Sequence, residues 1–203
     1  IRLGSLEPKI ITEEFVSRLG NLDKICEQFH ISLQSGCDTV LKRMNRKYNT
    51  EEVEKCIELL RKKYPTVIFT ADVIVGFPGE TEEEFNITYE FLKKIRFYKI
   101  HTFKYSRRKG TVAEKMPNQI SPEVQEQRSK KVIELSNEMQ KEIDEQYLNK
   151  KVEVLFEEKQ GEYYKGHTKN YMMVNAKSEE DLTNKIREVE LIEIRENELK
   201  LKY

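Results

Sequence analysis

Residues 66–81 read TVIFTADVIVGFPGET and combine a long apolar run, a turn and a helix start. β-Branched residues dominate the run up to Val75, which is typical of a fully buried strand. Two glycines and a proline follow in Gly76–Gly79, and glycine lets a backbone approach a ligand closely. Thr81 and Glu84 form the capping-box pattern that begins a helix. We therefore expect a strand, a tight turn and a helix N-terminus to meet around one space.

Strand-like and helix-like segments alternate on both sides of this stretch. Short apolar runs between turn residues predict strands, and apolar residues repeating every three or four positions predict helices. Repeated strand–helix order argues for parallel strands with crossover helices, so the class is α/β. A partial (β/α) barrel and a doubly wound sheet both fit, and in either the chemistry belongs to the loops after the strands. We expect strands at 1–6, 30–33, 66–75 and 98–105, and helices at 12–29, 40–44, 50–64 and 81–95.

The chain after residue 120 has a different character. Residues 121–147 carry apolar side chains on one helical face, which predicts a long connecting helix. Beyond it, segments that alternate apolar with polar residues predict a small all-β domain. We expect this domain to close into a barrel, because closure removes exposed strand edges. The expected parts are an α/β domain at 1–120, a helix at 121–148 and a β-domain at 149–203, with strands near 152–157, 171–176, 188–194 and 198–203 and a turn at 166–171.

Composition limits the class of protein. The 203 residues include 36 basic and 36 acidic ones, so any nucleic-acid-binding face must be local. No apolar run approaches the roughly 20 residues that cross a bilayer, and no signal peptide is evident, so we expect a cytoplasmic protein that does not enter a membrane. Cys26, Cys37 and Cys56 are too widely spaced to suggest a disulfide framework or a metal site. The chain opens inside a strand without Met, and we expect it to belong to a longer protein.

Two further loops carry special residues. Ser32–Asp38 holds hydroxyls and an amide that suit a ribose or a carboxylate, although a polar loop with a helix cap is the better explanation of this loop alone. Lys104–Thr111 sets three consecutive basic residues beside an aromatic one, which suits phosphate or RNA, with a solvated charge run as the alternative. The sequence places no base near Cys37, and we interpret His30 and His101 as structural residues of strands.

Several stretches resemble the radical S-adenosylmethionine (SAM) methylthiotransferases in their order and spacing. The resemblance implies a partial TIM-like barrel with two of its strands outside this chain. It also implies [4Fe–4S] clusters held by cysteines that this chain lacks, one of which binds and cleaves SAM. The stretches are Arg2–Pro8 (RLGSLEP), His30–Cys37 (HISLQSGC), Lys42–Tyr48 (KRMNRKY) and Asp72–Thr81 (DVIVGFPGET), while Gly166–Tyr171 (GHTKNY) resembles the TRAM domain that closes these enzymes.

The resemblance assigns roles to residues of this chain, none of them catalytic and none of them metal ligands. Those implied to line SAM follow three strands: Ser32, Gln34 and Ser35; Gly76, Phe77, Pro78, Gly79 and Glu80; and Tyr105, Ser106 and Arg108. Those implied to contact tRNA lie in the basic loop and the β-domain: Arg107, Lys109, Lys165, His167, Lys169, Asn170 and Tyr171.

The resemblance is strongest to the branch acting on N6-threonylcarbamoyladenosine beside the tRNA anticodon. Cys37 and the loop Arg107–Thr111 carry this finer similarity. The implied reaction adds a methylthio group at C2 of that adenosine, with this chain alone inactive for want of cluster cysteines. Two alternatives stay open: the branch modifying an aspartate of a ribosomal protein, and a cluster-free RNA-binding module. An exposed edge of a truncated sheet would also permit pairing into a dimer.

Overall fold

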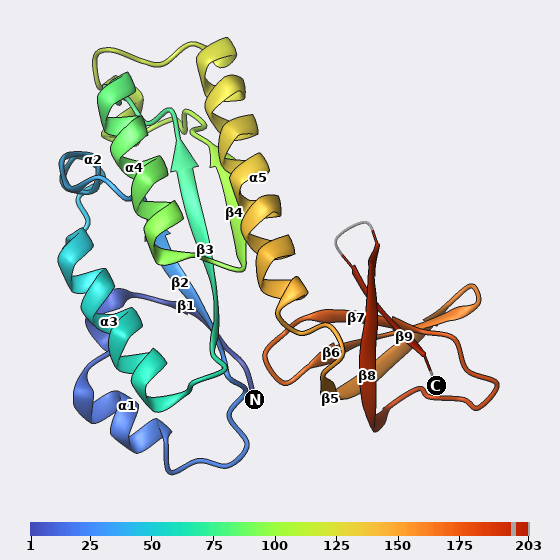
Figure 1. The fold of residues 1–203 in the computed structure, drawn as a ribbon. Coiled ribbons are helices and arrows are strands. Elements are labelled where there is room, and N and C mark those ends of the chain that lie inside the picture. The colour runs from blue at the N-terminus through green and yellow to red at the C-terminus, as the bar shows by residue number, and fades with distance from the viewer. Residues whose placement is uncertain (196–197, 203) are drawn as a thin grey trace.

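The computed structural model describes residues 1–195 and 198–202, which form an α/β unit and a β-barrel joined by one long helix (Figure 1). The α/β unit contains strands β1 (Leu3–Leu6), β2 (Gln28–Gln34), β3 (Ile68–Val75) and β4 (Lys99–Lys104) with helices α1 (Glu13–Leu19), α2 (Asp38–Arg43), α3 (Thr50–Lys63) and α4 (Glu82–Ile95), and 3-10 turns at Pro8–Ile10 and Ala113–Lys115. Helix α5 (Pro122–Glu145) leads to β5 (Lys151–Gln160), β6 (Tyr163–Thr168), β7 (Met173–Ala176), β8 (Lys185–Arg195) and β9 (Glu198–Lys202).

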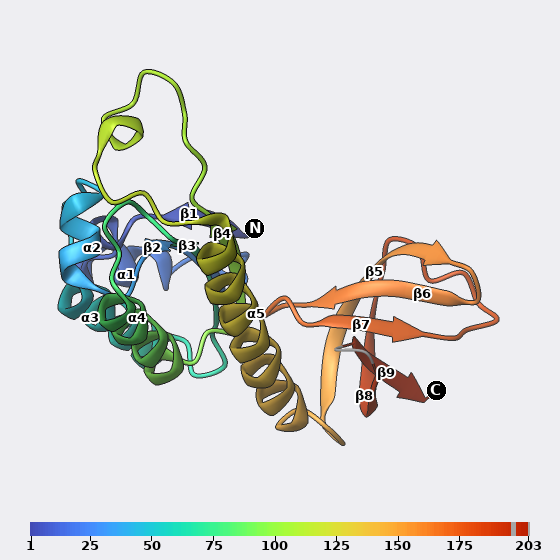
Figure 2. The same ribbon diagram turned by 90° about the horizontal axis from the view of Figure 1, so that it is seen from above.

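The four strands of the first unit are parallel and lie in the order β1-β2-β3-β4. This order confirms the predicted α/β class. Sequential order is the pattern of a singly wound sheet, whereas a doubly wound sheet reverses its order at a switch point. Figure 2 shows α2, α3 and α4 on one side of the sheet and the loop between β4 and α5 on the other. The strands form an open sheet, so the closed part of a TIM-like barrel is not seen in the described residues.

The two faces of this sheet differ in character. Alternate residues of β2, namely Phe29, Ile31 and Leu33, are buried in the core beneath the helices. Phe69, Ala71, Val73 and Val75 of β3 join the same core. The residues between them point to the other face, where β3 carries the half-buried Asp72 and Ile74. The prediction of a fully buried strand is therefore correct for β3 except at Asp72 and Ile74.

The first predicted helix is shorter than expected. Helix α1 ends at Leu19, and its last turn closes with Gly20 N–H donating to the carbonyl of Val16. Residues 20–27 form turns and loop, and β2 already begins at Gln28. The apolar residues Ile25 and Phe29 kept the helical period in the sequence, but they are buried from a loop and a strand. Burial alone therefore produced the misleading periodicity.

The β-unit is a closed barrel with the strand order β5-β6-β7-β9-β8. The sequence predicts a small barrel here but not this order. Strand β6 was not predicted, because residues 166–171 were interpreted as a turn. Its alternate residues Tyr164, Gly166 and Thr168 are buried, and a Cβ at Gly166 would lie 2.4 Å from the Leu155 carbonyl oxygen. The glycine allows this close strand pairing, while the polar residues between make the segment resemble a turn.

In the part of the chain that the structure describes, no helix has both the length and the apolar character needed to cross a bilayer.

Candidate functional site

A pocket of about 480 Å³ lies at the carboxyl ends of β2, β3 and β4. In parallel α/β folds this end of the sheet is where ligands bind. The loops that the sequence singled out after the strands contribute to it. Side chains also come from the face of the sheet opposite α2, α3 and α4, which we call the open face (Figure 2). We call the pocket itself the carboxyl-end pocket, lined by Gln34, Asp72, Ile74, Phe77, Phe103, Lys104, Tyr105, Ser106, Arg108, Thr111 and Ala113.

One wall of the carboxyl-end pocket is aromatic. The rings of Phe77 and Tyr105 meet edge to face at 5.3 Å between centroids. Phe103 is 53% exposed, which is unusual for a ring of this size in a strand. The Tyr105 hydroxyl is buried without a hydrogen-bond partner among the described residues. An apolar wall with an unsatisfied hydroxyl favours a flat ligand that also carries polar groups.

The turn after β3 is shaped by its glycines. Gly76 has φ +72° and Gly79 has φ +79°, both in the left-handed region that glycine adopts without strain. A Cβ at Gly76 would lie 2.4 Å from Cγ of Gln125 on α5, so the turn packs directly against that helix. The Gly79 N–H donates to the carbonyl of Asn118 at 2.9 Å. The turn is therefore fixed in place before any ligand binds.

Glu80 holds this turn to α5 from the inside. Its carboxylate accepts hydrogen bonds from the Gly76 N–H and from Nη1 of Arg128, each at 2.7 Å. The side chains are 1% and 6% exposed. Burial raises the pKa of Glu80 despite the opposing effects of Gly76 and Arg128. The structure thus gives Glu80 an internal partner, and its predicted contact with SAM stays a prediction.

The loop after β2 likewise contains residues that line the pocket and residues that bond inside the protein. Gln34, with φ +67°, lines the carboxyl-end pocket. Ser35 is fully buried, where its hydroxyl hydrogen-bonds Thr88 at 3.1 Å and accepts the Cys37 N–H at 3.2 Å. The carbonyl of Ser32 accepts from the Tyr48 hydroxyl at 2.6 Å. Of the three predicted SAM residues here, Gln34 alone is among those that line the pocket.

The remaining predicted SAM residues fall into two groups. Phe77, Tyr105, Ser106 and Arg108 line the carboxyl-end pocket, whereas Pro78 is buried in the turn and Gly79 is half-buried beside Arg43.

The cysteines do not form a site for an iron–sulfur cluster. Cys37 is 3% exposed, and Cys56 donates from its thiol to the carbonyl of Pro8 at 3.0 Å. Burial raises the pKa of Cys56 to about 11, so its thiolate is disfavoured. Among the described residues no three histidine, cysteine or acidic side chains are placed to hold a metal ion. The residues described here therefore do not fit a cluster.

The open face of the sheet carries a polar cluster that sequence reasoning missed. Gln28 and Thr70 are buried there, and His30 lies 3.0 Å from the carboxylate of Asp72. The His30 and His101 rings lie 5.5 Å apart. Polar residues alternate with apolar ones in β2 and β3, and this alternation could have predicted the cluster. The many β-branched residues of 66–75 favoured a fully buried strand instead.

The predicted RNA-contacting residues of the β-barrel lie largely where the barrel meets the α/β unit. Asn170 is 7% exposed, and its Nδ2 donates to the carbonyl of Thr66 at 3.2 Å and to the Tyr147 hydroxyl at 2.9 Å. The rings of His167 and Tyr171 stack at 4.7 Å, with the guanidinium of Arg2 4.1 Å from the Tyr171 centroid. We call this contact the domain junction, formed by Arg2, Thr66, Tyr147, His167, Asn170 and Tyr171.

The predicted basic contacts are more accessible. Lys169 is exposed beside the domain junction, and Lys165 is half-buried on β6. Arg107 and Lys109 are exposed on the segment after β4, where Nη2 of Arg107 donates to the carbonyl of Glu114 at 2.8 Å. The three exposed side chains, Lys169, Arg107 and Lys109, are of the basic type that phosphate contacts require.

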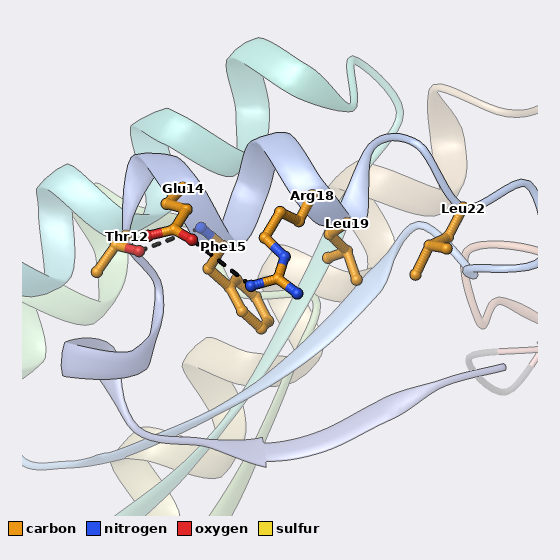
Figure 3. A pocket seen from close by; sticks show the side chains of 6 residues that line it. All are labelled: Thr12, Glu14, Phe15, Arg18, Leu19 and Leu22. Carbon is orange, nitrogen blue, oxygen red and sulfur yellow. Dashed lines mark hydrogen bonds and ion pairs between the residues drawn. The ribbon is translucent and has the colours of Figure 1, made fainter.

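A second groove, of about 540 Å³, lies beside α1 (Figure 3). Its charged pair Glu14–Arg18 is 80% exposed on both side chains, at 3.5 Å, and contributes little fixed charge. Figure 1 places α1 at the end of the sheet where β2 and β3 begin, away from the strand ends where chemistry is expected. This groove therefore has no polar groups fixed toward a ligand. Its lining residues are Thr12, Glu14, Phe15, Arg18, Leu19 and Leu22.

Comparisons with known proteins agree with this geometry. Residues 4–92 match the Radical SAM superfamily. The chain is 43% identical over 197 residues to the threonylcarbamoyladenosine tRNA methylthiotransferase MtaB of Bacillus subtilis (strain 168), covering 95% of the chain and 44% of the relative. It is 39% identical to the tRNA-2-methylthio-N(6)-dimethylallyladenosine synthase of Alkaliphilus oremlandii (strain OhILAs), covering 96% of the chain and 42% of the relative.

A solved structure shows the same fold. The coproporphyrinogen III oxidase HemN of Escherichia coli, described as a radical SAM enzyme, aligns with TM-score 0.57 at 17% identity. The alignment covers 68% of this chain and 32% of that protein. At this identity the likeness shows the fold alone. The chain thus spans less than half the length of the curated relatives it matches.

Proposed function

We propose that the chain belongs to the radical SAM methylthiotransferase family and is part of an enzyme that modifies tRNA. The reaction adds a methylthio group at C2 of N6-threonylcarbamoyladenosine beside the anticodon. The 43% identity to a relative named for that nucleoside, along nearly the whole chain, is the observation that carries this proposal.

The carboxyl-end pocket is the proposed SAM-facing part of the site. The aromatic pair of Phe77 and Tyr105 suits the flat base of SAM, and Arg108 offers a guanidinium to an anionic group. The fixed turn at Gly76 and Gly79 supplies a close backbone surface. When bound beside a [4Fe–4S] cluster, SAM supplies a radical, and the cysteines for that cluster would come from outside this chain. We accordingly propose that this chain alone is inactive.

The closed β-barrel is proposed to act as a TRAM domain that grips tRNA. Lys165, Lys169, Arg107 and Lys109 are the proposed phosphate contacts, because they are basic and all but the half-buried Lys165 are exposed. His167, Asn170 and Tyr171 are proposed to act together with them from the domain junction. The contacts of Asn170 and Tyr171 with the α/β unit support a role in orienting the barrel toward the RNA as well as touching it.

Two further parts of the proposal concern location and assembly. An enzyme acting on tRNA would work in the cytoplasm. Strands β1 and β4 each pair with one neighbour within the described residues, so an edge of the sheet offers backbone donors and acceptors to another chain. That partner would be the rest of the same protein or, in a dimer, a second copy.

The decisive experiment uses the full-length protein that contains this chain. We would reconstitute it anaerobically with iron and sulfide, incubate it with SAM and tRNA, and analyse the digested nucleosides by mass spectrometry. Methylthio addition to N6-threonylcarbamoyladenosine is the expected result. The 39% identity to a dimethylallyladenosine synthase makes that nucleoside the second candidate, so tRNA carrying it belongs in a parallel reaction.

The controls separate the remaining alternatives. SAM cleavage without any modified nucleoside would contradict a tRNA substrate, and the aspartate of a ribosomal protein would be tested next. The chain 1–203 alone, carried through the same reconstitution, should yield neither cluster absorbance nor product. Product formed by the chain alone would contradict the proposal that the cluster cysteines lie outside it.

A further inference from the structure

The open face of the parallel sheet contains a connected line of polar side chains that ends at the carboxyl-end pocket. Its members come from β2 and β3: Gln28 and His30 from the first, Thr70 and Asp72 from the second. Gln28 is 5% and Thr70 is 2% exposed. Polar groups this deeply buried are destabilising unless each is hydrogen-bonded, so the arrangement of the bonds is informative.

The bonds run in one direction. Nε2 of Gln28 donates to the Thr70 hydroxyl oxygen at 2.9 Å. That hydroxyl and Nδ1 of His30 lie 2.8 Å apart, and Nε2 of His30 lies 3.0 Å from Oδ2 of Asp72. A neutral histidine has one donor nitrogen and one acceptor nitrogen. With the Thr70 hydroxyl donating to Nδ1, the proton of His30 sits on Nε2 and points at Asp72. Each polar hydrogen in the line then has one acceptor.

Asp72 is the end of this line and lies on the wall of the carboxyl-end pocket. Its side chain is 26% exposed, and it is held by His30 from behind through Oδ2. A carboxylate fixed by one oxygen presents the other as a hydrogen-bond acceptor. His101 lies opposite Asp72 in the register of β3 and β4. Burial lowers the pKa of His101, which favours its uncharged form beside the acceptor.

The aromatic wall and this acceptor together define a ligand class. Enzymes that act on a base in RNA or DNA take it out of its stack, place it against aromatic side chains and read its polar edge through hydrogen bonds. Carboxylates read exocyclic amino groups, because they are acceptors only. In this pocket Phe103 offers the exposed ring and Asp72 the oriented acceptor.

We propose that the part of the carboxyl-end pocket at Phe103 and Asp72 receives the extruded substrate purine, beside the Phe77–Tyr105 part proposed for SAM. Asp72 accepts a hydrogen bond from the exocyclic N–H of the purine, with His30, Thr70 and Gln28 acting as positioning residues. This inference rests on the proposed function for the identity of the RNA. It adds the part of the nucleoside that is read and the side chain that reads it.

The test measures RNA binding by the full-length protein, without turnover. The probes are two fluorescein-labelled anticodon stem-loops, with adenosine or purine riboside beside the anticodon, which differ only in the exocyclic amino group. We expect the wild-type protein to bind the adenosine probe about tenfold more tightly by fluorescence anisotropy, the discrimination typical of a well-placed contact to a base edge. In Asp72→Asn the two affinities should become equal, because the amide oxygen accepts the Nε2–H of His30 and leaves the NH2 group, which is a donor, facing the base.

The positioning residues are tested by the same ratio of affinities. Thr70→Val keeps the side-chain shape but removes the hydroxyl between Gln28 and His30, so most of the discrimination should disappear. Thr70→Ser should restore it. Thr102→Val on the neighbouring strand removes a buried hydroxyl that has no partner among the described residues, and should leave the ratio unchanged.

Three results would overturn the inference. Equal binding of both probes by the wild-type protein would show that the amino group is not read. An unchanged ratio in Asp72→Asn would show that another group reads it. Failure to bind either probe would overturn the inference, and failure to bind a stem-loop carrying N6-threonylcarbamoyladenosine as well would contradict the tRNA substrate itself. The first two results leave the proposed function standing, so failure of the inference and failure of the function are distinguishable.

Discussion

The two ends of the parallel sheet use polar side chains in opposite ways. At the amino ends of the strands, Asn170 and Tyr98 bond to groups inside the protein and join the β-barrel to the α/β unit. At the carboxyl ends, Tyr105 has a buried hydroxyl without a partner in the described part of the chain, and Asp72 faces a pocket. The difference supports the proposal that the amino end is rigid and that a ligand completes the carboxyl end.

Glu80→Ala should have the largest effect, because the rigid support of the carboxyl end depends on one buried pair. Removing the carboxylate leaves Arg128 charged and 6% exposed, and also leaves the Gly76 N–H without its acceptor. We expect the free energy of unfolding to fall by about 3–5 kcal/mol. Urea denaturation followed by circular dichroism measures it.

Glu82→Gln is the matched control for Glu80→Ala. Glu82 also pairs with Arg128, at 3.2 Å, but its side chain is 54% exposed. Its loss should lower the unfolding free energy by less than about 1 kcal/mol. Equal effects of the two variants would mean that burial of Glu80 does not determine its contribution, and the rigid turn would lose its explanation.

Asp144→Asn should have the next largest effect, in the opposite direction. Asp144 is fully buried near the domain junction, where it accepts the Tyr98 hydroxyl at 3.0 Å. Burial raises the pKa of Asp144 from 3.8 to about 6, so the ionised form is disfavoured in the folded protein. The native protein therefore loses stability from this group as pH rises from about 4 to 6, and the asparagine variant does not. At pH 7 the variant should be more stable by about 2–3 kcal/mol.

The pH dependence is the decisive readout for Asp144→Asn. Thermal or urea unfolding at pH 4 should show little difference between the native protein and the variant, and at pH 7 a clear gain. Glu145→Gln, on the exposed neighbour, should show neither. If the difference in stability between the variant and the native protein were the same at pH 4 and pH 7, burial would not disfavour the ionised form of Asp144.

The smallest expected effects come from two neighbouring residues in one turn of the β-barrel, one of which stabilises the fold while the other is proposed to bind RNA. Asn170→Ala removes the donor to Thr66 and Tyr147 and should cost about 1–2 kcal/mol of unfolding free energy. Lys169→Ala, on the exposed neighbour, should leave stability within about 0.5 kcal/mol but weaken RNA binding and reduce its salt dependence. If Lys169→Ala left RNA affinity unchanged, the proposed phosphate contact would be wrong.

Local patterns in the sequence predicted the elements that depend on neighbouring residues. The strand up to Val75, the turn at Gly76 and Gly79, and the capping box of Thr81 and Glu84 all lie where expected. Each depends on backbone preference or on hydrogen bonds between residues four or fewer positions apart. The change to alternating strands after residue 150 likewise predicted the β-barrel, since a period of two is a local signal.

The errors have a common cause in long-range packing. Ile25 and Phe29 are buried by residues far along the chain, which gave a loop and a strand the period of a helix. The sequence also did not show which polar loop residues bond inside the protein. Ser35 bonds to Thr88 and Glu80 to Arg128, each across at least 48 residues. A single sequence does not reveal which polar side chain finds such a partner.

The sequence by itself therefore predicted the α/β class, the separate β-barrel and the family resemblance, because these follow from periodicity and from long motifs that keep their order. Only the tertiary structure decided which motif residues face the carboxyl-end pocket and which bond inward, and it alone brought His30, Thr70 and Asp72 into one line. The physical reason is that pairing of β2 with β3 sets residues about 40 positions apart within hydrogen-bonding distance, as Gln28 and Thr70 show.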